Sequence, residues 1–185
     1  MITVDGVSLR AKIVRKRVRN VNARLVGNEL RVSAPPTVQR TELDATVRRL
    51  ARMLVRRARA EVLNVDGQAL AVVRKVAEKF PKPPRVRSVR FVTTQRSRWG
   101  SYSPSTGLIR LHGSLRQLPA WVLEAVVAHE LAHAFHQDHS TAFWKLVREV
   151  CPATDRANAF LEGVSWIAER WDRLPNVERA LLAGS

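Results

Sequence analysis

The segment from residue 121 to residue 133 constrains the fold more than any other part of the chain. Its sequence is Trp-Val-Leu-Glu-Ala-Val-Val-Ala-His-Glu-Leu-Ala-His, and its apolar residues would cover nearly the whole surface of a helix. We expect such a helix to be buried. On it, His129 and His133 are four residues apart and share one face, and Glu130 lies beside them. Three polar groups on one arc of a buried helix need a chemical reason.

Metal binding is the reason that this spacing indicates. Two histidines four residues apart on a helix can bind one metal ion, and Glu130, about 100° around the helix from His129, has the position of a general base for metal-bound water. His136 and His139 follow, so four of the 5 histidines lie close together in the sequence. Chance does not explain this cluster. We predict a single metal site and expect zinc, because zinc favours imidazole ligands.

A catalytic zinc ion has three protein ligands and one open position, so a third ligand is needed. His139 is the geometrically easier choice because the helix can turn back at residues 137–138 before it. His136 would lie about 10 Å along the helix axis from His129, which would strain a tetrahedral site. Three alternatives to His139 stay open: His136, Glu149 and Glu162.

The sequence resembles the YgjP-like metallopeptidase family, which is related to the SprT-like (Spartan-type) zinc proteases. The resemblance is carried by three motifs: Arg98-Trp99-Gly100-Ser101, His129-Glu-Leu-Ala-His133 and His139-Ser-Thr-Ala-Phe143-Trp144. It covers most of the chain and implies that His129, His133 and His139 bind zinc and that Glu130 is the catalytic residue. It also implies an α+β fold with a zincin-like protease domain, in which a small antiparallel or mixed sheet accompanies the active-site helix.

Three further residues are candidates for contacts with the substrate or the transition state. Tyr102 and His112 stand where the family often has Cys and Asn, and either could stabilise an oxyanion. The alternative for these two is a packed tyrosine and a histidine on the surface of a strand. His136 would line the pocket, or else lie on the surface. We also expect the strand 108–112 to offer its edge to an extended peptide substrate.

Local patterns predict the remaining elements. Gly27-Asn28 between two alternating segments indicates a β-hairpin, because both residues tolerate positive φ in a tight turn. Thr41 and Asp44 suggest a capping box at the start of a helix with an apolar stripe. That stripe comprises Leu43, Val47, Leu50, Leu54, Ala58 and Val62. Further helices are expected over residues 68–80, 119–136, 141–150 and 155–172, and strands over residues 85–93 and 108–112.

Positive charge is concentrated in the first half of the chain. Lys and Arg number 32 against 16 Asp and Glu, a net charge of +16, and the whole excess lies within residues 1–100. This surplus predicts non-specific contact with the phosphates of single- or double-stranded DNA, although a solvated arginine face is the simpler alternative. The candidate nucleic-acid-binding residues are Arg15, Lys16, Arg17, Arg19, Arg48, Arg49, Arg52, Arg56 and Arg59.

We therefore expect a basic hairpin and helix over residues 1–64 and a compact catalytic region over residues 65–185. A lone cysteine and the lack of any apolar run of about 18 residues suggest a cytoplasmic protein, associated with the nucleoid if it binds DNA. The predicted function is zinc-dependent hydrolysis of peptide bonds, with DNA-associated proteins as candidate substrates. The alternatives are a metal-dependent nucleotide pyrophosphatase and a non-catalytic nucleic-acid-binding module with structural zinc.

Overall fold

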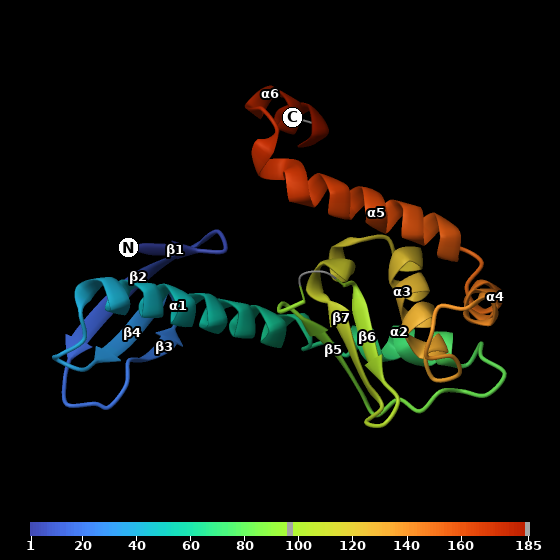
Figure 1. Cartoon of the computed structure of the whole chain (residues 1–185), viewed down its shortest axis with the longest axis horizontal. Coiled ribbons are helices and arrows are strands. Elements are labelled where there is room, and N and C mark those ends of the chain that lie inside the picture. Colours follow the sequence, from blue (N-terminus) through green and yellow to red (C-terminus); the bar gives the residue numbers. More distant parts are fainter. Residues whose placement is uncertain (96–97, 184–185) are drawn as a thin grey trace. The chain divides into compact units, whose positions relative to one another are not determined.

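The structure is a computed structural model of the chain and describes residues 1–95 and 98–183 (Figure 1). The chain divides into two compact units, Met1–Asp66 and Gly67–Ser185. The α+β architecture is as predicted, since each unit combines a small mixed sheet with helices. Within the described residues, no helix combines the length and the apolar character that crossing a membrane requires.

The first unit is a four-stranded sheet packed against one helix. Its elements are β1 (Ile2–Val4), β2 (Val7–Arg15), β3 (Asn22–Val26), β4 (Glu29–Ala34) and α1 (Arg40–Leu63). The strand order is β1-β2-β4-β3, in which β2 and β4 are parallel and the other two pairs are antiparallel. Alternate residues of β4 are buried, and α1 covers that face of the sheet. The centre of this core comprises Leu30, Val32, Ala34, Leu43, Val47 and Ala51.

The structure confirms the hairpin of this unit and corrects its helix. β3 and β4 form the predicted hairpin, and Gly27 in the turn has a φ of 56°. The predicted capping box is wrong: α1 begins at Arg40, after Gln39, and no side chain caps it. Thr41 therefore lies inside the first turn rather than before it. The apolar stripe is buried only in its first half, and Val62 is 61% exposed, because the helix continues past the core that the sheet provides.

The second unit combines a three-stranded sheet with five α-helices in the part of the chain that the structure describes. Its elements are α2 (Gln68–Ala77), β5 (Ser88–Val92), β6 (Gly100–Ser103), β7 (Leu108–His112), α3 (Ala120–Ala132), α4 (Thr141–Val150), α5 (Thr154–Arg170) and α6 (Asn176–Ala183), with short 3-10 helices at Gly113–Gln117 and Trp171–Arg173. β7 is the central strand, parallel to β5 and antiparallel to β6.

Helix α3 is the core of this unit. Nearly every residue from Val122 to Ala132 is buried, as the apolar sequence predicts. Helices α2, α4 and α5 and strand β6 all contact α3, and Figure 1 shows this arrangement. Because tertiary packing surrounds the helix, the polar groups at its C-terminal end are held in fixed positions rather than displayed on a solvated surface.

Two predictions for this unit need correction. The helix expected to reach residue 136 ends at Ala132, because the backbone N–H groups of Phe135 and His136 both bond to the Ala132 carbonyl and close a tight turn. The strand 108–112 has the predicted bounds, but it is central and has no free edge. The free edge beside α3 belongs to β6, a strand that the sequence did not predict.

Candidate metal centre

Helix α3 carries three polar residues at its C-terminal end. His129 and Glu130 lie in the last turn, and His133 caps the helix. The four-residue spacing brings the two imidazole rings together, with centroids 5.2 Å apart. Glu130 lies between them in the sequence and belongs to the buried part of the helix.

A short loop returns the chain to this pair. It ends at Ser140, whose side chain accepts a 3.4 Å hydrogen bond from the backbone N–H of Phe143 and caps α4. The loop places Nε2 of His139 3.1 Å from Nε2 of His129. One ring nitrogen from each of His129, His133 and His139 lies within 4.8 Å of the other two, and the described residues contain no second cluster of this kind.

This donor set fits a divalent metal ion. Two imidazole nitrogens bound tetrahedrally to one zinc ion lie about 3.3 Å apart, close to the separation seen here between His129 and His139. Burial, reinforced by the neighbouring histidines, lowers the pKa of His129 to about 4, so its ring is neutral near pH 7. The Nδ1–H of His133 donates to the backbone carbonyl of His136 at 3.1 Å, which leaves the Nε2 lone pair of His133 for a metal.

One aromatic ring contacts all three histidines. Phe143 is fully buried, and its centroid lies 4.8–4.9 Å from each of the three imidazole rings. The ring of Trp144 packs beside two of them, 5.5 Å from His129 and 5.8 Å from His139. These apolar contacts restrict the rotamers of the imidazoles, so the three nitrogens are oriented by packing as well as by the backbone.

The carboxyl group of Glu130 lies between the metal cluster and strand β6. Its residue is only 8% exposed, its side chain packs directly on Gly100, and the backbone N–H of Tyr102 donates to it. Burial raises the pKa of Glu130 to about 7, while the Tyr102 N–H and the charge of Arg98 act in the opposite direction. A carboxyl group with this pKa can both accept and release a proton near neutral pH.

These groups line an open cleft of about 530 Å³. Its lining consists of Arg98, Gly100, Ser101, Tyr102, Pro104, His129, Glu130, His133, Gln137 and His139. The free edge of β6 forms one side, and α3 with the loop that follows forms another. Among these described lining residues, Arg98 is the only lysine or arginine. The cleft therefore combines a candidate metal site, a proton-accepting group and an unpaired strand edge.

Comparison with known protein families identifies this arrangement. The family model for the YgjP-like metallopeptidase domain matches residues 37–163. The chain belongs to the YgjP-like family. The match extends from the loop between β4 and α1 into α5 and includes every residue of the cleft. The resemblance inferred from the sequence is thus confirmed. No curated protein and no solved structure matches the chain.

The three predicted substrate contacts lie in different places in this YgjP-like domain. Tyr102 lines the cleft, but its hydroxyl donates to the backbone carbonyl of Arg85 at 2.8 Å. His112 ends β7 and packs edge-on against Trp99, with centroids 5.1 Å apart, and it does not line the cleft. His136 supports the cluster through its backbone carbonyl. The structure therefore brings only Tyr102 of these three to the cleft itself.

The predicted nucleic-acid-binding residues lie in the first unit, and three of them have partners within it. Arg15 donates to the backbone carbonyls of Pro35, Pro36 and Val38, in the loop before α1. Arg56 pairs with Asp5 at 2.6 Å, and Arg52 approaches the same carboxylate at 3.6 Å. The remaining candidates are exposed: Lys16, Arg17, Arg19, Arg48, Arg49 and Arg59.

Sequence reasoning missed the functions of Gly100 and Phe143 in this YgjP-like domain. The close approach of Gly100 to Glu130 is a tertiary contact for which the local sequence gives no signal. For Phe143 a signal exists, because it follows His139 by four residues, and this spacing places side chains together at the start of a helix. Both residues lie within quoted motifs, but their roles depend on what packs against them.

Proposed function

We propose that the chain is a zinc-dependent metallopeptidase with a zincin-like catalytic unit that hydrolyses peptide bonds in protein substrates. One observation carries the proposal: the buried carboxyl group of Glu130 lies beside a cluster of three imidazoles and at the wall of an open cleft. The family supplies the reaction class, because the matched domain is a metallopeptidase domain.

His129, His133 and His139 would hold the zinc ion. When bound, zinc supplies Lewis acidity and lowers the pKa of water. Glu130 accepts the proton of the water that attacks the peptide carbonyl carbon. As the C–N bond breaks, Glu130 donates this proton to the leaving nitrogen. Its burial and raised pKa support both transfers, because the protonated and ionised forms of the carboxyl group are then close in free energy.

The outer edge of β6, which pairs with no other strand among the described residues, supports an extended peptide as the substrate. A peptide can add to such an edge through backbone hydrogen bonds, and Ser101 and Tyr102 line the cleft along it. This strand takes the role that the sequence assigned to residues 108–112. Side-chain specificity at the edge is expected to be low, because backbone groups provide most of the contacts.

The two alternative functions have less support. A structural zinc site has no use for a buried carboxyl group such as Glu130 that is not a ligand. A nucleotide pyrophosphatase needs cations to neutralise a triphosphate, and Arg98 is the only lysine or arginine among the described residues of the cleft. The basic first unit, with 15 lysines and arginines against 6 acidic residues, instead supports DNA-associated proteins as substrates.

The experiment compares wild type with Glu130→Gln on casein, with and without DNA, and on nucleoside triphosphates. We expect one zinc ion per chain in both proteins and a loss of casein hydrolysis of at least about 100-fold in the variant. Glu149→Gln, on the exposed side of α4, is the matched control and should keep full activity and zinc. Triphosphate hydrolysis that depends on Glu130, with casein left intact, would contradict the peptidase.

A further inference from the structure

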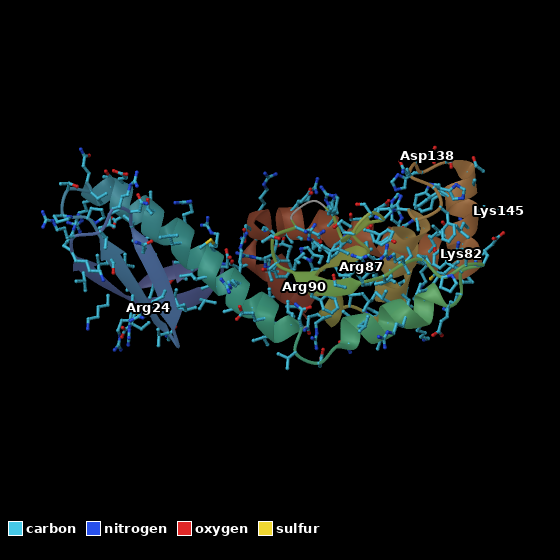
Figure 2. All side chains as sticks on the ribbon, turned by 90° about the horizontal axis from the view of Figure 1, so that it is seen from below. Arg24, Lys82, Arg87, Arg90, Asp138 and Lys145 are labelled. Atoms are coloured by element: carbon cyan, nitrogen blue, oxygen red, sulfur yellow. The ribbon has the colours of Figure 1, made fainter. Side chains whose placement is uncertain are left out.

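One face of the first sheet is covered by α1, and the other is not. On β4 the buried residues alternate with Arg31 and its neighbours, which point to the uncovered face. The registers with β2 and β3 place Lys12 and Arg24 on that same face. All three side chains are exposed, and Figure 2 shows Arg24 on the side of the sheet away from α1.

The three cations form a single row across three neighbouring strands. Arg31 is directly opposite Lys12 of β2 and directly opposite Arg24 of β3. Adjacent strands are about 4.8 Å apart, so the row spans about 10 Å. Like charges directly opposite one another destabilise a sheet. The four strands contain one acidic residue, Glu29, which pairs with Arg31 at 2.6 Å. The row therefore brings three like charges together, and Glu29 is the one acidic residue of these strands that offsets them.

A hollow of about 610 Å³ lies over this row. Its polar lining consists of Lys12, Lys16, Asn22, Arg24, Arg31 and Ser33. No acidic residue lines it among the described residues, and there only Arg31 of its four cations has an acidic partner, Glu29, which lies outside the lining. Anions with several closely spaced charges are the ligands that complement such a surface.

We propose that this uncovered sheet face binds the phosphate backbone of double-stranded DNA. It binds through Lys12, Lys16, Arg24 and Arg31. The inference is independent of the proposed peptidase activity, because it concerns a different unit and is measured by binding alone. It also differs from the prediction made from the sequence, which placed most of the contacts on the arginines of α1.

The composition of the first unit favours a duplex over a single strand. Single-stranded nucleic acids are held largely by aromatic rings that stack on the bases. Residues 1–79 contain no Phe, Trp or Tyr. The unit therefore lacks aromatic rings for stacking on bases but has many cations for phosphates, which is the chemistry of non-specific duplex binding.

The shape of the β3–β4 hairpin favours DNA over RNA. The major groove of B-form DNA is about 12 Å wide and admits a two-stranded β-ribbon, whereas the major groove of an A-form duplex is too narrow for side chains. Arg24 and Arg31 lie opposite each other on this hairpin. β4 also pairs with β2, so the β3 edge and the turn at Gly27 are the part that enters a groove.

The arginines of α1 are the weaker surface. Arg52 and Arg56 approach Asp5, which neutralises part of their charge. The remaining exposed arginines lie on a helix that covers the other face of the sheet, so one duplex cannot contact both sets. Arg48, Arg49 and Arg59 therefore provide a control in which the same charge is removed elsewhere on the same unit.

The test measures the affinity of the full-length chain for a 20-base-pair DNA duplex by fluorescence anisotropy at 50 and 200 mM salt. Four phosphate contacts predict a slope of log K against log salt of about −3.6, so wild-type affinity should fall about 150-fold between the two salt concentrations. The triple variant Lys12→Ser, Arg24→Ser, Arg31→Ser should retain a slope of about −0.9 and lose only about 3-fold. Its thermal midpoint should equal or exceed that of wild type, because the like-charge row is gone.

The control triple variant Arg48→Ser, Arg49→Ser, Arg59→Ser should keep a slope within about one unit of wild type. Equal losses in the two triple variants would overturn the proposal in favour of a net-charge effect, and a larger loss in the control would assign binding to α1. Tighter binding of single-stranded DNA or of duplex RNA would also overturn it, as would displacement of the duplex by micromolar tripolyphosphate. Absence of duplex binding by the wild type at 50 mM salt is equally decisive against it.

Discussion

Gly100 lies so close to Glu130 that a Cβ atom at position 100 would stand 2.6 Å from Oε1 of the carboxyl group and 2.7 Å from its Cγ. The distance is below any that real Cβ atoms show, so either the strand or the glutamate must move if a side chain is added. The absence of one methyl group at Gly100 therefore permits the position that Glu130 occupies against β6.

Replacing Gly100 by alanine is expected to separate metal binding from catalysis. The added methyl group displaces the Glu130 carboxyl group but leaves the three histidines on α3 and the following loop. Peptidase activity should fall by at least about 100-fold, because misplacing a reacting group by about 1 Å has this cost. Zinc content, measured by elemental analysis, should stay at one ion per chain.

The control for this substitution is Gly163→Ala. Gly163 lies in α5, and a Cβ atom there meets nothing within 4 Å. Alanine should therefore stabilise the helix by about 0.5–1 kcal/mol and leave activity unchanged. If Gly100→Ala and Gly163→Ala have equal activity, the contact between Gly100 and Glu130 does not position the base.

The ring of Phe143 should contribute to metal affinity as well as to stability. In Phe143→Leu the three imidazoles lose a shared contact, and we expect zinc affinity to fall about 10-fold, as it does when supporting groups of metal ligands are removed. Competition with a chelator measures this loss. Phe91→Leu removes a ring from another fully buried site and is matched in burial. The two variants should unfold at similar denaturant concentrations, and a similar loss of zinc affinity in both would contradict a specific role for Phe143.

Two histidines close in sequence should respond differently to alanine. His139→Ala removes a ring nitrogen from the cluster and should release zinc, and removal of zinc by a chelator should likewise abolish wild-type activity. His136→Ala should retain zinc, because its contact with His133 is made by the backbone carbonyl. Zinc stoichiometry after dialysis measures both. Zinc loss in His136→Ala with retention in His139→Ala would reverse the assignment of the third ligand.

The ion pair between α2 and α3 predicts a pH-dependent contribution to stability. Lys75 donates to Glu124 at 2.8 Å and lowers the pKa of that carboxyl group below its usual 4.5. The contribution is therefore present above about pH 4.5 and is lost as the pH falls through the lower pKa of the folded state. Because Lys75 is well exposed, we expect only about 0.5 kcal/mol.

Urea unfolding of wild type and Glu124→Gln at pH 7 and pH 3 measures this contribution. The difference in the free energy of unfolding should be near 0.5 kcal/mol at pH 7 and near zero at pH 3. The exposed Glu162→Gln serves as the control and should show no difference at either pH. A Glu124→Gln difference that persists unchanged at pH 3 would show that packing, and not the ion pair, is responsible.

The elements that the sequence predicted well are those whose local pattern agrees with their tertiary environment. α4 has the predicted bounds, and the spacing of His129 and His133 determines their common face once the helix is assigned. The pairing of β3 with β4 follows from the turn at Gly27. In each of these cases, residues that are neighbours in the sequence determine the local structure.

The features that escaped prediction depend on distant parts of the chain. β6 has only four residues, too few for an alternating pattern. Its free edge depends on the strand order β5-β7-β6, which places β6 at one side of the sheet. α1 begins at Arg40 without a capping side chain. Instead, the side chain of Arg15, distant in the sequence, donates to backbone carbonyls of the loop that precedes the helix. The raised pKa of Glu130 results from its burial, and its side chain packs on Gly100 of β6, thirty positions earlier in the sequence.

The shortness of β6 has a consequence for how substrates would be chosen. An edge of four residues, with the Tyr102 N–H already given to Glu130, can form only a few backbone hydrogen bonds with a peptide. Each such bond contributes about 1 kcal/mol net, so the cleft alone would hold peptides at millimolar affinity. When the first unit binds the same assembly as the substrate protein, the effective concentration of that substrate at the cleft reaches the millimolar range. The location at which the first unit is bound would then determine which proteins are cut. The amino-acid sequence at the scissile bond would have a smaller influence.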